Sequence, residues 1–214
     1  MNANKIIVRA AKEIKDGQII NLGIGLPTRI IEHIPTDMDV FFHSENGILG
    51  AKIRSPDEAA DRELIDAGGR YITTRPGASF FDSSVSFAMI RRGKIDISLM
   101  GAFEVDEEGN IANWKIPGYF SPGIGGAMEL AQKTPRLVVM CTHNDKKGNS
   151  KILKKCKLPL TATNCVDRII TDKAVMDVTS KGLVVREIAE DLTFEELIDQ
   201  TDATLIIAEN VGRF

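Results

Sequence analysis

A carboxylate at the end of a short predicted strand is the group in this sequence best placed to do chemistry. Glu45 lies in the segment Ser44-Glu45-Asn46-Gly47, directly after the mostly apolar run 39–43, and Gly50 keeps the next stretch open. Ligands bind at strand ends in α/β sheets, so a carboxylate at this point could be catalytic. A solvated loop glutamate is the ordinary alternative. The four residues alone leave both interpretations open.

Two glycine-rich loops could supply backbone donors to an anion. Residues 21–28 read NLGIGLPT and residues 122–130 read PGIGGAMEL. In the second loop Gly125 and Gly126 precede a predicted helix, so their N–H groups can point at an anion near its positive end. The plain structural alternative is a sharp strand-to-helix turn that needs the conformational freedom of glycine. Neither loop is a dinucleotide fingerprint, because the second lacks the final glycine and the first breaks at Pro27.

In this order and over this length, these segments closely resemble the family I CoA-transferases, specifically the β subunit of 3-oxoacid (acetoacetate/butyrate-type) CoA-transferases. The resemblance runs through most of the chain. It includes four more segments, PGAS at 76–79, FDSSVSFAMIR at 81–91, ANW at 112–114 and LPLT at 158–161. Each glycine motif is weak evidence by itself, whereas the ordered set is strong.

The resemblance implies roles for individual residues. Glu45 is the expected nucleophile, Gly126 the expected backbone donor to the oxyanion, and Asn21 is expected near the carboxylate or the CoA arm. The other residues expected in the oxyanion and CoA-binding site are Gly23, Gly25, Asn46 and Gly125.

The implied reaction moves CoA between an acyl-CoA and a carboxylic acid through a covalent glutamyl-CoA thioester on Glu45. A protein carboxylate divides the exchange into two easier displacements, which need no metal or redox cofactor because CoA is itself a substrate. The resemblance also implies that the chain is half an enzyme. Its expected partner is a CoA-transferase α subunit, in an α2β2 assembly.

Two other functions stay open from the sequence. An acyl-CoA hydrolase of the same family would let water resolve the intermediate, and water access to Glu45 would decide between the two reactions. A non-catalytic sensor of sugar phosphates would use the same fold, but the sequence contains no helix-turn-helix pattern and no basic arm. Lys52 and Arg54 follow the glutamate where the family usually has small residues and proline, which leaves the acyl substrate open.

Composition narrows the class of protein further. The chain has 214 residues and a net charge of −3, which argues against a nucleic-acid partner. Cys141, Cys156 and Cys165 form no CxxC pair, so we expect buried thiols and a reducing, cytoplasmic location. The three histidines lack the spacing of metal ligands. No apolar run is long enough to span a membrane.

Predicted strands alternate with predicted helices. Strands are expected at residues 18–22, 40–43, 95–100, 103–105, 110–114, 137–142, 166–171, 174–178 and 183–187. Helices are expected from the N-terminus to Gly17, over 28–33, from Ser83 or Ser84 to Gly93 with Val85, Ala88 and Met89 inward, over 126–132, and after the capping box 193–196. A further capping box at 55–58 starts either a helix or a loop.

This order predicts an α/β fold with an open, mixed and largely parallel sheet flanked by helices. The strands near the C-terminus predict an added antiparallel layer rather than a second domain, so residues 1–214 are expected to form one CoA-transferase β-subunit domain. The resemblance implies the same architecture, that of the CoA-transferases and the related sugar-phosphate isomerases.

Overall fold

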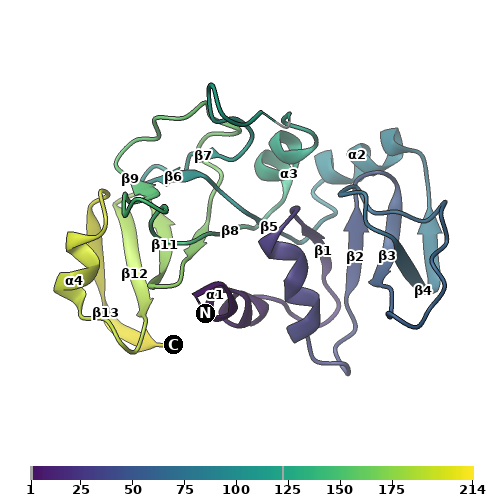
Figure 1. The fold of residues 1–214 in the computed structure, drawn as a ribbon, viewed down its shortest axis with the longest axis horizontal. Coiled ribbons are helices and arrows are strands. Elements are labelled where there is room, and N and C mark those ends of the chain that lie inside the picture. The colour runs from purple at the N-terminus through teal and green to yellow at the C-terminus, as the bar shows by residue number, and fades with distance from the viewer. Residues whose placement is uncertain (1, 122) are drawn as a thin grey trace.

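A ten-stranded sheet runs through the molecule (Figure 1). The structure is a computed structural model and describes residues 2–121 and 123–214. The strands lie in the order β13-β12-β11-β10-β8-β5-β1-β2-β3-β4. Their bounds are β1 Ile19–Leu22, β2 Phe41–Ser44, β3 Ile48–Ile53, β4 Ile72–Phe80, β5 Ile97–Met100, β8 Leu137–Met140, β10 Arg168–Ile170, β11 Ala174–Thr179, β12 Gly182–Ile188 and β13 Leu205–Arg213.

The centre of this sheet is parallel and its flanks are mixed. Strands β2, β1, β5, β8 and β10 pair in parallel, whereas β3 and β4 on one side and β11 and β12 on the other pair antiparallel. A small second sheet contains β6 Glu104–Asp106, β7 Ile111–Ala112 and β9 Ile152–Leu153. The predicted fold class is therefore confirmed.

Helices cover both faces of the sheet. The α-helix α1 Asn2–Ala11 and the 3-10 helix η1 Leu26–His33 pack on one face, and α2 Ser83–Arg91, α3 Ala127–Lys133 and α4 Phe194–Asp199 pack on the other. Side chains of a strand alternate between these two cores, so Val138 contacts the α1 core and Val139 the opposite one. The central strands β5 and β8 are buried along their whole length, as parallel strands covered on both faces are.

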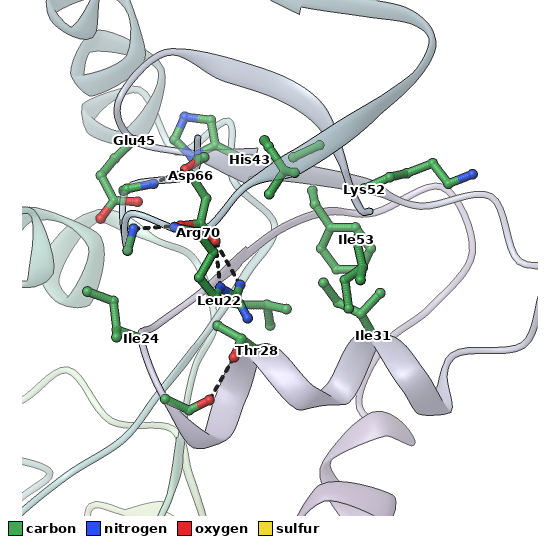
Figure 2. Close-up of a pocket in the computed structure, with 17 residues that line it drawn as sticks. Leu22, Ile24, Thr28, Ile31, His43, Glu45, Lys52, Ile53, Asp66 and Arg70 are labelled. Atoms are coloured by element: carbon green, nitrogen blue, oxygen red, sulfur yellow. Dashed lines mark hydrogen bonds and ion pairs between the residues drawn. The ribbon is translucent and has the colours of Figure 1, made fainter. Parts of the chain in front are cut away.

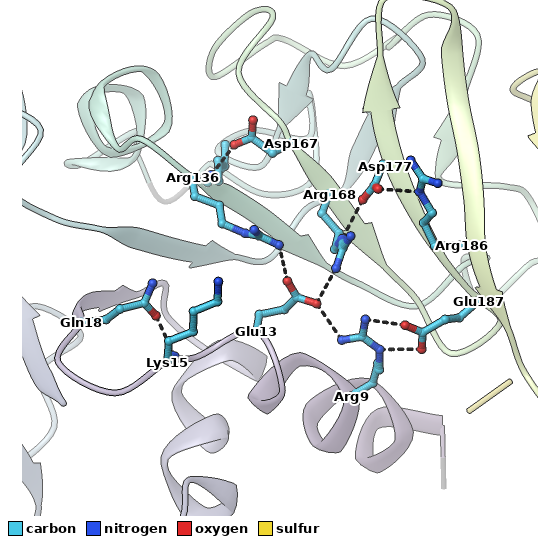
Figure 3. A network of polar contacts seen from close by, with 11 residues as sticks. Arg9, Glu13, Lys15, Gln18, Arg136, Asp167, Arg168, Asp177, Arg186 and Glu187 are labelled. Carbon is cyan, nitrogen blue, oxygen red and sulfur yellow. Dashed lines mark hydrogen bonds and ion pairs between the residues drawn. The ribbon is translucent and has the colours of Figure 1, made fainter. Parts of the chain in front are cut away.

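A buried ion network ties α1 to the amino ends of the central strands (Figure 3). The carboxylate of Glu13 accepts from Arg9 Nη1 at 2.7 Å and from Arg168 Nη1 at 2.8 Å, and it also pairs with Arg136. Arg9 donates in turn to both carboxylate oxygens of Glu187, at 2.6 and 2.7 Å. Arg136 and Arg168 stand at the starts of β8 and β10, so the network lies at the amino ends of the parallel strands.

Most predicted elements are present with small shifts at their ends, and the capping box of α4 is formed by Thr193 and Glu196. The N-terminal stripe of apolar residues is buried as predicted, but α1 ends at Ala11 rather than at Gly17. The segment 55–58 is loop rather than helix, although Ser55 N–H does donate to Glu58. Pro122 of the second glycine loop lies outside the described residues.

Three expectations are wrong. Asp82, not Ser83 or Ser84, caps α2, and the helix buries Ser86 and Ile90 while Val85 is exposed. The C-terminal strands extend the same sheet edge to edge and form no separate layer. Strands β3, β4, β9 and β13 were not predicted at all. The prediction of one domain over residues 1–214 stays a prediction.

Candidate active site

The segment Ser44-Glu45-Asn46-Gly47 is a tight turn between β2 and β3. The Gly47 N–H donates to the Ser44 carbonyl at 3.0 Å and closes the turn. Gly47 has φ of +122°, and a Cβ there would lie 2.0 Å from the Phe81 carbonyl oxygen. No other residue type fits this position, because both the backbone conformation and the contact exclude a side chain.

Side chains of the same turn fix it to the loop before β4. The Ser44 hydroxyl accepts from the Ala67 N–H at 2.9 Å, and the Asn46 amide donates to the Ile65 carbonyl at 2.8 Å. Both neighbours of Glu45 are therefore used to hold the turn. Its own side chain takes no part in these contacts and is left half-exposed.

Asn21 brings the first glycine loop to this carboxylate. Strands β1 and β2 are parallel, and Asn21 lies opposite His43 in their register. The Asn21 Nδ2 donates to Glu45 Oε2 at 3.2 Å, and Asn21 is almost completely buried. The donor is thus held on a central strand, where it has little freedom to move away from the carboxylate.

Gly126 brings the second glycine loop to the same place. It is the N-cap of α3 and has φ of −80°, while the preceding Gly125 is left-handed with φ of +51°. A Cβ on Gly126 would lie 3.4 Å from Glu45 Cγ and 3.1 Å from Phe87 Cζ. Only a residue without a side chain lets the backbone approach the glutamate this closely.

The remaining predicted site residues have structural contacts of their own. The Gly23 N–H donates to the Leu99 carbonyl at 2.8 Å, and a Cβ there would be 3.3 Å from backbone atoms of β5. Gly25 has φ of +92° and caps η1, where its carbonyl accepts from the Thr28 hydroxyl at 2.7 Å. Their predicted contact with CoA stays a prediction.

A cavity of about 370 Å³ opens beside Glu45 (Figure 2). Glu45 lies at one end of it, and Ile31, Ile53 and Lys52 lie at the other. The walls are mainly apolar and come from β1, η1, β2, β3 and the loop before β4, with Leu22, Ile24, Phe42, Ala51 and Ile72 among the lining residues.

Two of the cations near this cavity are already paired. Arg70 lines the cavity and donates through Nε and Nη2 to Asp66 at 2.9 and 2.7 Å. Arg54 turns to its own loop, where it binds the carbonyl oxygens of Ser55 and Glu58. Lys52 lines the far end. Lys52 and Arg54 are close together in the sequence, but the structure brings only Lys52 to the cavity.

The sequence pattern assigns no role to His43, yet its ring lies against the site. The ring is 4% exposed, and burial lowers the pKa of His43 to about 4, so the imidazole is neutral near pH 7. Its Nδ1 is 3.4 Å from Asn21 Nδ2, and its Nε2 is 2.8 Å from the Ser86 hydroxyl. Ser86 is 43 residues away on α2, so no local sequence signal marks this contact.

The cysteines do not provide a competing nucleophile. Burial, with nearby carboxylates, raises the pKa of Cys165 to about 12 and that of Cys156 above its usual range, and burial raises the pKa of Cys141 to about 11. Residues 2–121 and 123–214 also contain no group of three or more metal-type ligands. No helix in that same part of the chain is long and apolar enough to cross a membrane.

Two further segments that carried the family resemblance contact each other beside the small sheet. The Thr161 hydroxyl donates to Asn113 Oδ1 at 2.6 Å, and the Trp114 indole donates to the Leu160 carbonyl at 3.1 Å. The fold therefore brings segments 112–114 and 158–161 into contact.

Comparison with known proteins defines the class. The family model for coenzyme A transferase matches residues 3–200. The β subunit of a probable coenzyme A transferase of Bacillus subtilis is 47% identical over 204 residues, which cover 95% of this chain and 94% of the relative. The chain therefore belongs to the coenzyme A transferase family, as a subunit of the β type.

A second relative and a solved structure add detail. The equivalent subunit of a probable succinyl-CoA:3-ketoacid coenzyme A transferase of Bacillus subtilis is 44% identical, over 97% of this chain and 96% of the relative. The apoenzyme of an acyl-CoA transferase from Escherichia coli O157:H7 has the same fold, with a TM-score of 0.81 at 21% identity, over 100% of this chain and 43% of that chain. The same enzyme in a thioester complex with CoA matches with a TM-score of 0.78.

Proposed function

We propose that Glu45 is the nucleophile of a CoA transfer between an acyl-CoA and a carboxylic acid, with 3-oxoacids and short acyl groups as the substrate class. One observation carries the proposal. Glu45 is a half-exposed carboxylate at the carboxyl end of the parallel strands, with Asn21 on one side, the Gly126 backbone on the other and a cavity beside it. The names of the relatives, one of which is a succinyl-CoA:3-ketoacid coenzyme A transferase, support the substrate class.

Each half of the reaction balances without a cofactor. A Glu45 oxygen attacks the acyl carbonyl carbon, the C–S bond breaks, and CoA leaves as the thiolate with a mixed anhydride on the enzyme. The thiolate then attacks the glutamyl carbonyl carbon, the acid leaves as its carboxylate, and a glutamyl-CoA thioester remains. The second carboxylate reverses both steps and regenerates Glu45. The thioester complex described for the E. coli enzyme supports such an intermediate.

Asn21 and Gly126 are the donors we assign to the oxyanions. Each attack passes through a tetrahedral oxyanion, which pre-placed N–H groups stabilise more than they stabilise the ground state. Asn21 Nδ2 already touches Glu45, and the Gly126 backbone lies in van der Waals reach of its side chain. A glutamate is a modest nucleophile, so this positioning supplies much of the rate.

The cavity gives the acyl chain a place to bind. Its mainly apolar walls suit the carbon chain of a short acyl group, and its volume of about 370 Å³ is within the range of small-molecule sites. Lys52 at the far end and the Arg70–Asp66 pair in the wall are the polar groups available to a functional group on that chain.

The partner we propose is a CoA-transferase α subunit, in an α2β2 assembly. The relatives are named as single subunits of their enzymes, and the chain matches only 43% of the E. coli enzyme, so a second half of comparable size belongs to that enzyme. Transfer activity in the purified chain alone would contradict this assembly.

Trapping the intermediate tests the proposed nucleophile. The chain together with its α subunit is incubated with acetoacetyl-CoA without an acceptor, treated with borohydride, digested and analysed by mass spectrometry. We expect a reduced side chain at Glu45 and no such product in the Glu45→Gln variant. A label on another residue contradicts the assignment.

The same incubation separates transferase from hydrolase. A transferase stops after stoichiometric loading when no acceptor is present, whereas a hydrolase continues to release CoA. Steady release of free CoA without an acceptor would favour the hydrolase.

A further inference from the structure

A buried histidine and a buried serine form a chain of contacts that ends at Glu45. His43 belongs to β2 and Ser86 to α2, and both are buried, Ser86 completely. The Ser86 hydroxyl is 2.8 Å from His43 Nε2, His43 Nδ1 is 3.4 Å from Asn21 Nδ2, and Asn21 Nδ2 is 3.2 Å from Glu45 Oε2. Three elements of the fold are therefore connected to the nucleophile through polar side chains.

The surroundings of Asn21 determine which way its amide points. Its Nδ2 faces three acceptors, namely Glu45 Oε2, the His43 carbonyl at 3.3 Å and the His43 ring nitrogen. A flipped amide would place its oxygen against the carboxylate and the carbonyl, which repel it. With Nδ2 in place, His43 Nδ1 must accept, so the ring proton lies on Nε2 and is donated to Ser86.

The other side of the amide offers no support. Asn21 Oδ1 is buried, and within residues 2–121 and 123–214 it has no hydrogen-bond partner. The direction of the Asn21 side chain therefore depends on the contacts of its Nδ2 alone. Of these, the contact with His43 Nδ1 is the one that a side-chain substitution can remove without changing Glu45.

We propose that His43 and Ser86 are positioning residues that hold the Asn21 amide toward Glu45 for the transfer reaction. The inference rests on the proposed function, because it assigns to Asn21 a role in the chemistry of Glu45. The ring Nδ1 and the carbonyl of His43 share one hydrogen of Nδ2, so that the other stays directed at the glutamate. Ser86 accepts from the Nε2–H of the tautomer whose Nδ1 accepts from Asn21.

The imidazole is well held for this role. Its ring stacks with Phe81 at a centroid distance of 6.5 Å and an interplanar angle of 19°. The Phe81 N–H in turn donates to the carbonyl of Gly47, the last residue of the glutamate turn. Burial lowers the pKa of His43 to about 4, which keeps Nδ1 free to accept at neutral pH. A charged ring would turn a donor toward Asn21 Nδ2 and destroy the arrangement.

Three variants test the inference in the complex with the α subunit. His43→Leu keeps much of the volume and removes both polar contacts. His43→Gln restores an acceptor for Asn21 and a donor for Ser86 within one side chain. Ser86→Ala leaves the buried Nε2–H of His43 without its acceptor. The matched control is Thr134→Val, since Thr134 is buried at the end of α3, and its hydroxyl has no partner in the described part of the chain.

The measurements are the rate of glutamyl-CoA formation in a single turnover, kcat and KM for the acyl-CoA, with thermal unfolding as a check of folding. Misplacement of a catalytic group by about 1 Å costs on the order of 10²-fold in rate. We expect His43→Leu to lower kcat and the loading rate by about 10- to 100-fold with little change in KM, and Ser86→Ala to lower them by less. His43→Gln should recover most of the loss, and Thr134→Val should behave as the wild type.

The outcomes separate this inference from the proposed function. If wild-type Glu45 is loaded and His43→Leu or Ser86→Ala loads at the wild-type rate, the inference is wrong and the proposed function stands. If His43→Leu does not fold, the soluble Ser86→Ala and His43→Gln variants decide, and equal rates in Ser86→Ala and Thr134→Val overturn the inference. If wild-type Glu45 is never loaded, the proposed function fails and the inference fails with it.

Discussion

Two glutamates at opposite ends of the parallel strands use the same side chain in contrasting ways. Glu13, at the amino ends, is 6% exposed and binds the guanidinium groups of Arg9, Arg136 and Arg168 (Figure 3). Glu45, at the carboxyl ends, is half-exposed at one end of the cavity (Figure 2). Within the described residues it accepts from Asn21 alone.

The contrast shows what prepares a carboxylate for chemistry. Burial alone would raise the pKa of Glu13, but hydrogen bonds and charges from Arg9 and Arg168 outweigh it and hold that pKa below the ordinary value. A carboxylate whose oxygens are occupied by arginines is a poor nucleophile. Glu45 has a single neutral donor, so its lone pairs stay available while its direction is still fixed.

The largest expected effect comes from removing the exposed carboxylate. Glu45→Gln, assayed with the α subunit, should lower transfer by at least about 10³-fold, because the nucleophile of a covalent reaction is lost. The midpoint of thermal unfolding should stay near that of the wild type, since the side chain makes one contact with the fold. Near-normal turnover in the folded variant would contradict the assignment.

Removing the charge of Glu13 from the ion network should lower the stability of the fold rather than the rate of transfer. Glu13→Gln leaves Arg9 and Arg168 without their shared carboxylate, and breaking a buried pair in this way costs about 3–5 kcal/mol. Urea unfolding measures this free energy. The rate of Glu45 loading per folded molecule should not change, and a loss of rate with unchanged stability would show that the two regions are coupled.

Acid should weaken the two regions in different pH ranges. His43 and His143 each have a pKa lowered to about 4, in both cases chiefly by burial and for His143 also by Lys173, whereas an ordinary histidine titrates at about 6.5. Between these values the unfolded chain binds more protons than the folded chain, so stability falls as the pH falls, by up to about 3 kcal/mol for each histidine. Glu13 and Asp177 have lowered pKa values, so their contribution is present above the ordinary carboxyl pKa of about 4 and is lost below it.

Urea unfolding at a series of pH values checks this order. In His43→Gln the slope of stability against pH between about 6.5 and 4 should be about half that of the wild type, because one of two titrating histidines is gone. An unchanged slope would mean that His43 does not titrate in that range.

The sequence was informative where local pattern and packing agree. The parallel strands β5 and β8 are continuous apolar runs, and α4 begins at a capping box, so both kinds of element were predictable. Strand β4 was missed because Pro76 and Gly77 interrupt it, which only an edge strand tolerates. Strand β13, at the opposite edge, is mostly half-buried or exposed and shows no apolar alternation.

The site also contains residues that the sequence predicted and a contact that it did not. Glu45, Asn21 and Gly126 were expected from the family resemblance, and the structure brings the three together. The contact between His43 and Ser86 was missed, because the buried face of α2 carries Ser86 and Ile90, whereas the apolar pattern predicted the face of Val85 and Ala88. A buried serine on α2 is explained by its polar partner across the fold, which no local pattern contains.

The smallest expected effect, that of Gly126→Ala, tests the geometry around Glu45 most directly. Gly126 has φ of −80°, so alanine is compatible with its backbone, but the added Cβ would lie 3.1 Å from Phe87 Cζ and 3.4 Å from Glu45 Cγ. The ring or the glutamate must therefore move. We expect Gly126→Ala to lower kcat by about 10-fold, with a loss of stability of about 1 kcal/mol.

Gly101→Ala is the control for this change, because its added Cβ would meet its nearest neighbour, the Met140 carbonyl oxygen, only at 4.0 Å. It should leave kcat unchanged. If both variants show the wild-type kcat, the close approach of Gly126 is a packing feature and the oxyanion donor must be sought elsewhere. If only Gly126→Ala is slow while its KM for the acyl-CoA is normal, the backbone at Gly126 acts on the reacting carboxylate rather than on substrate binding, since a group that binds ground state and transition state alike changes KM instead.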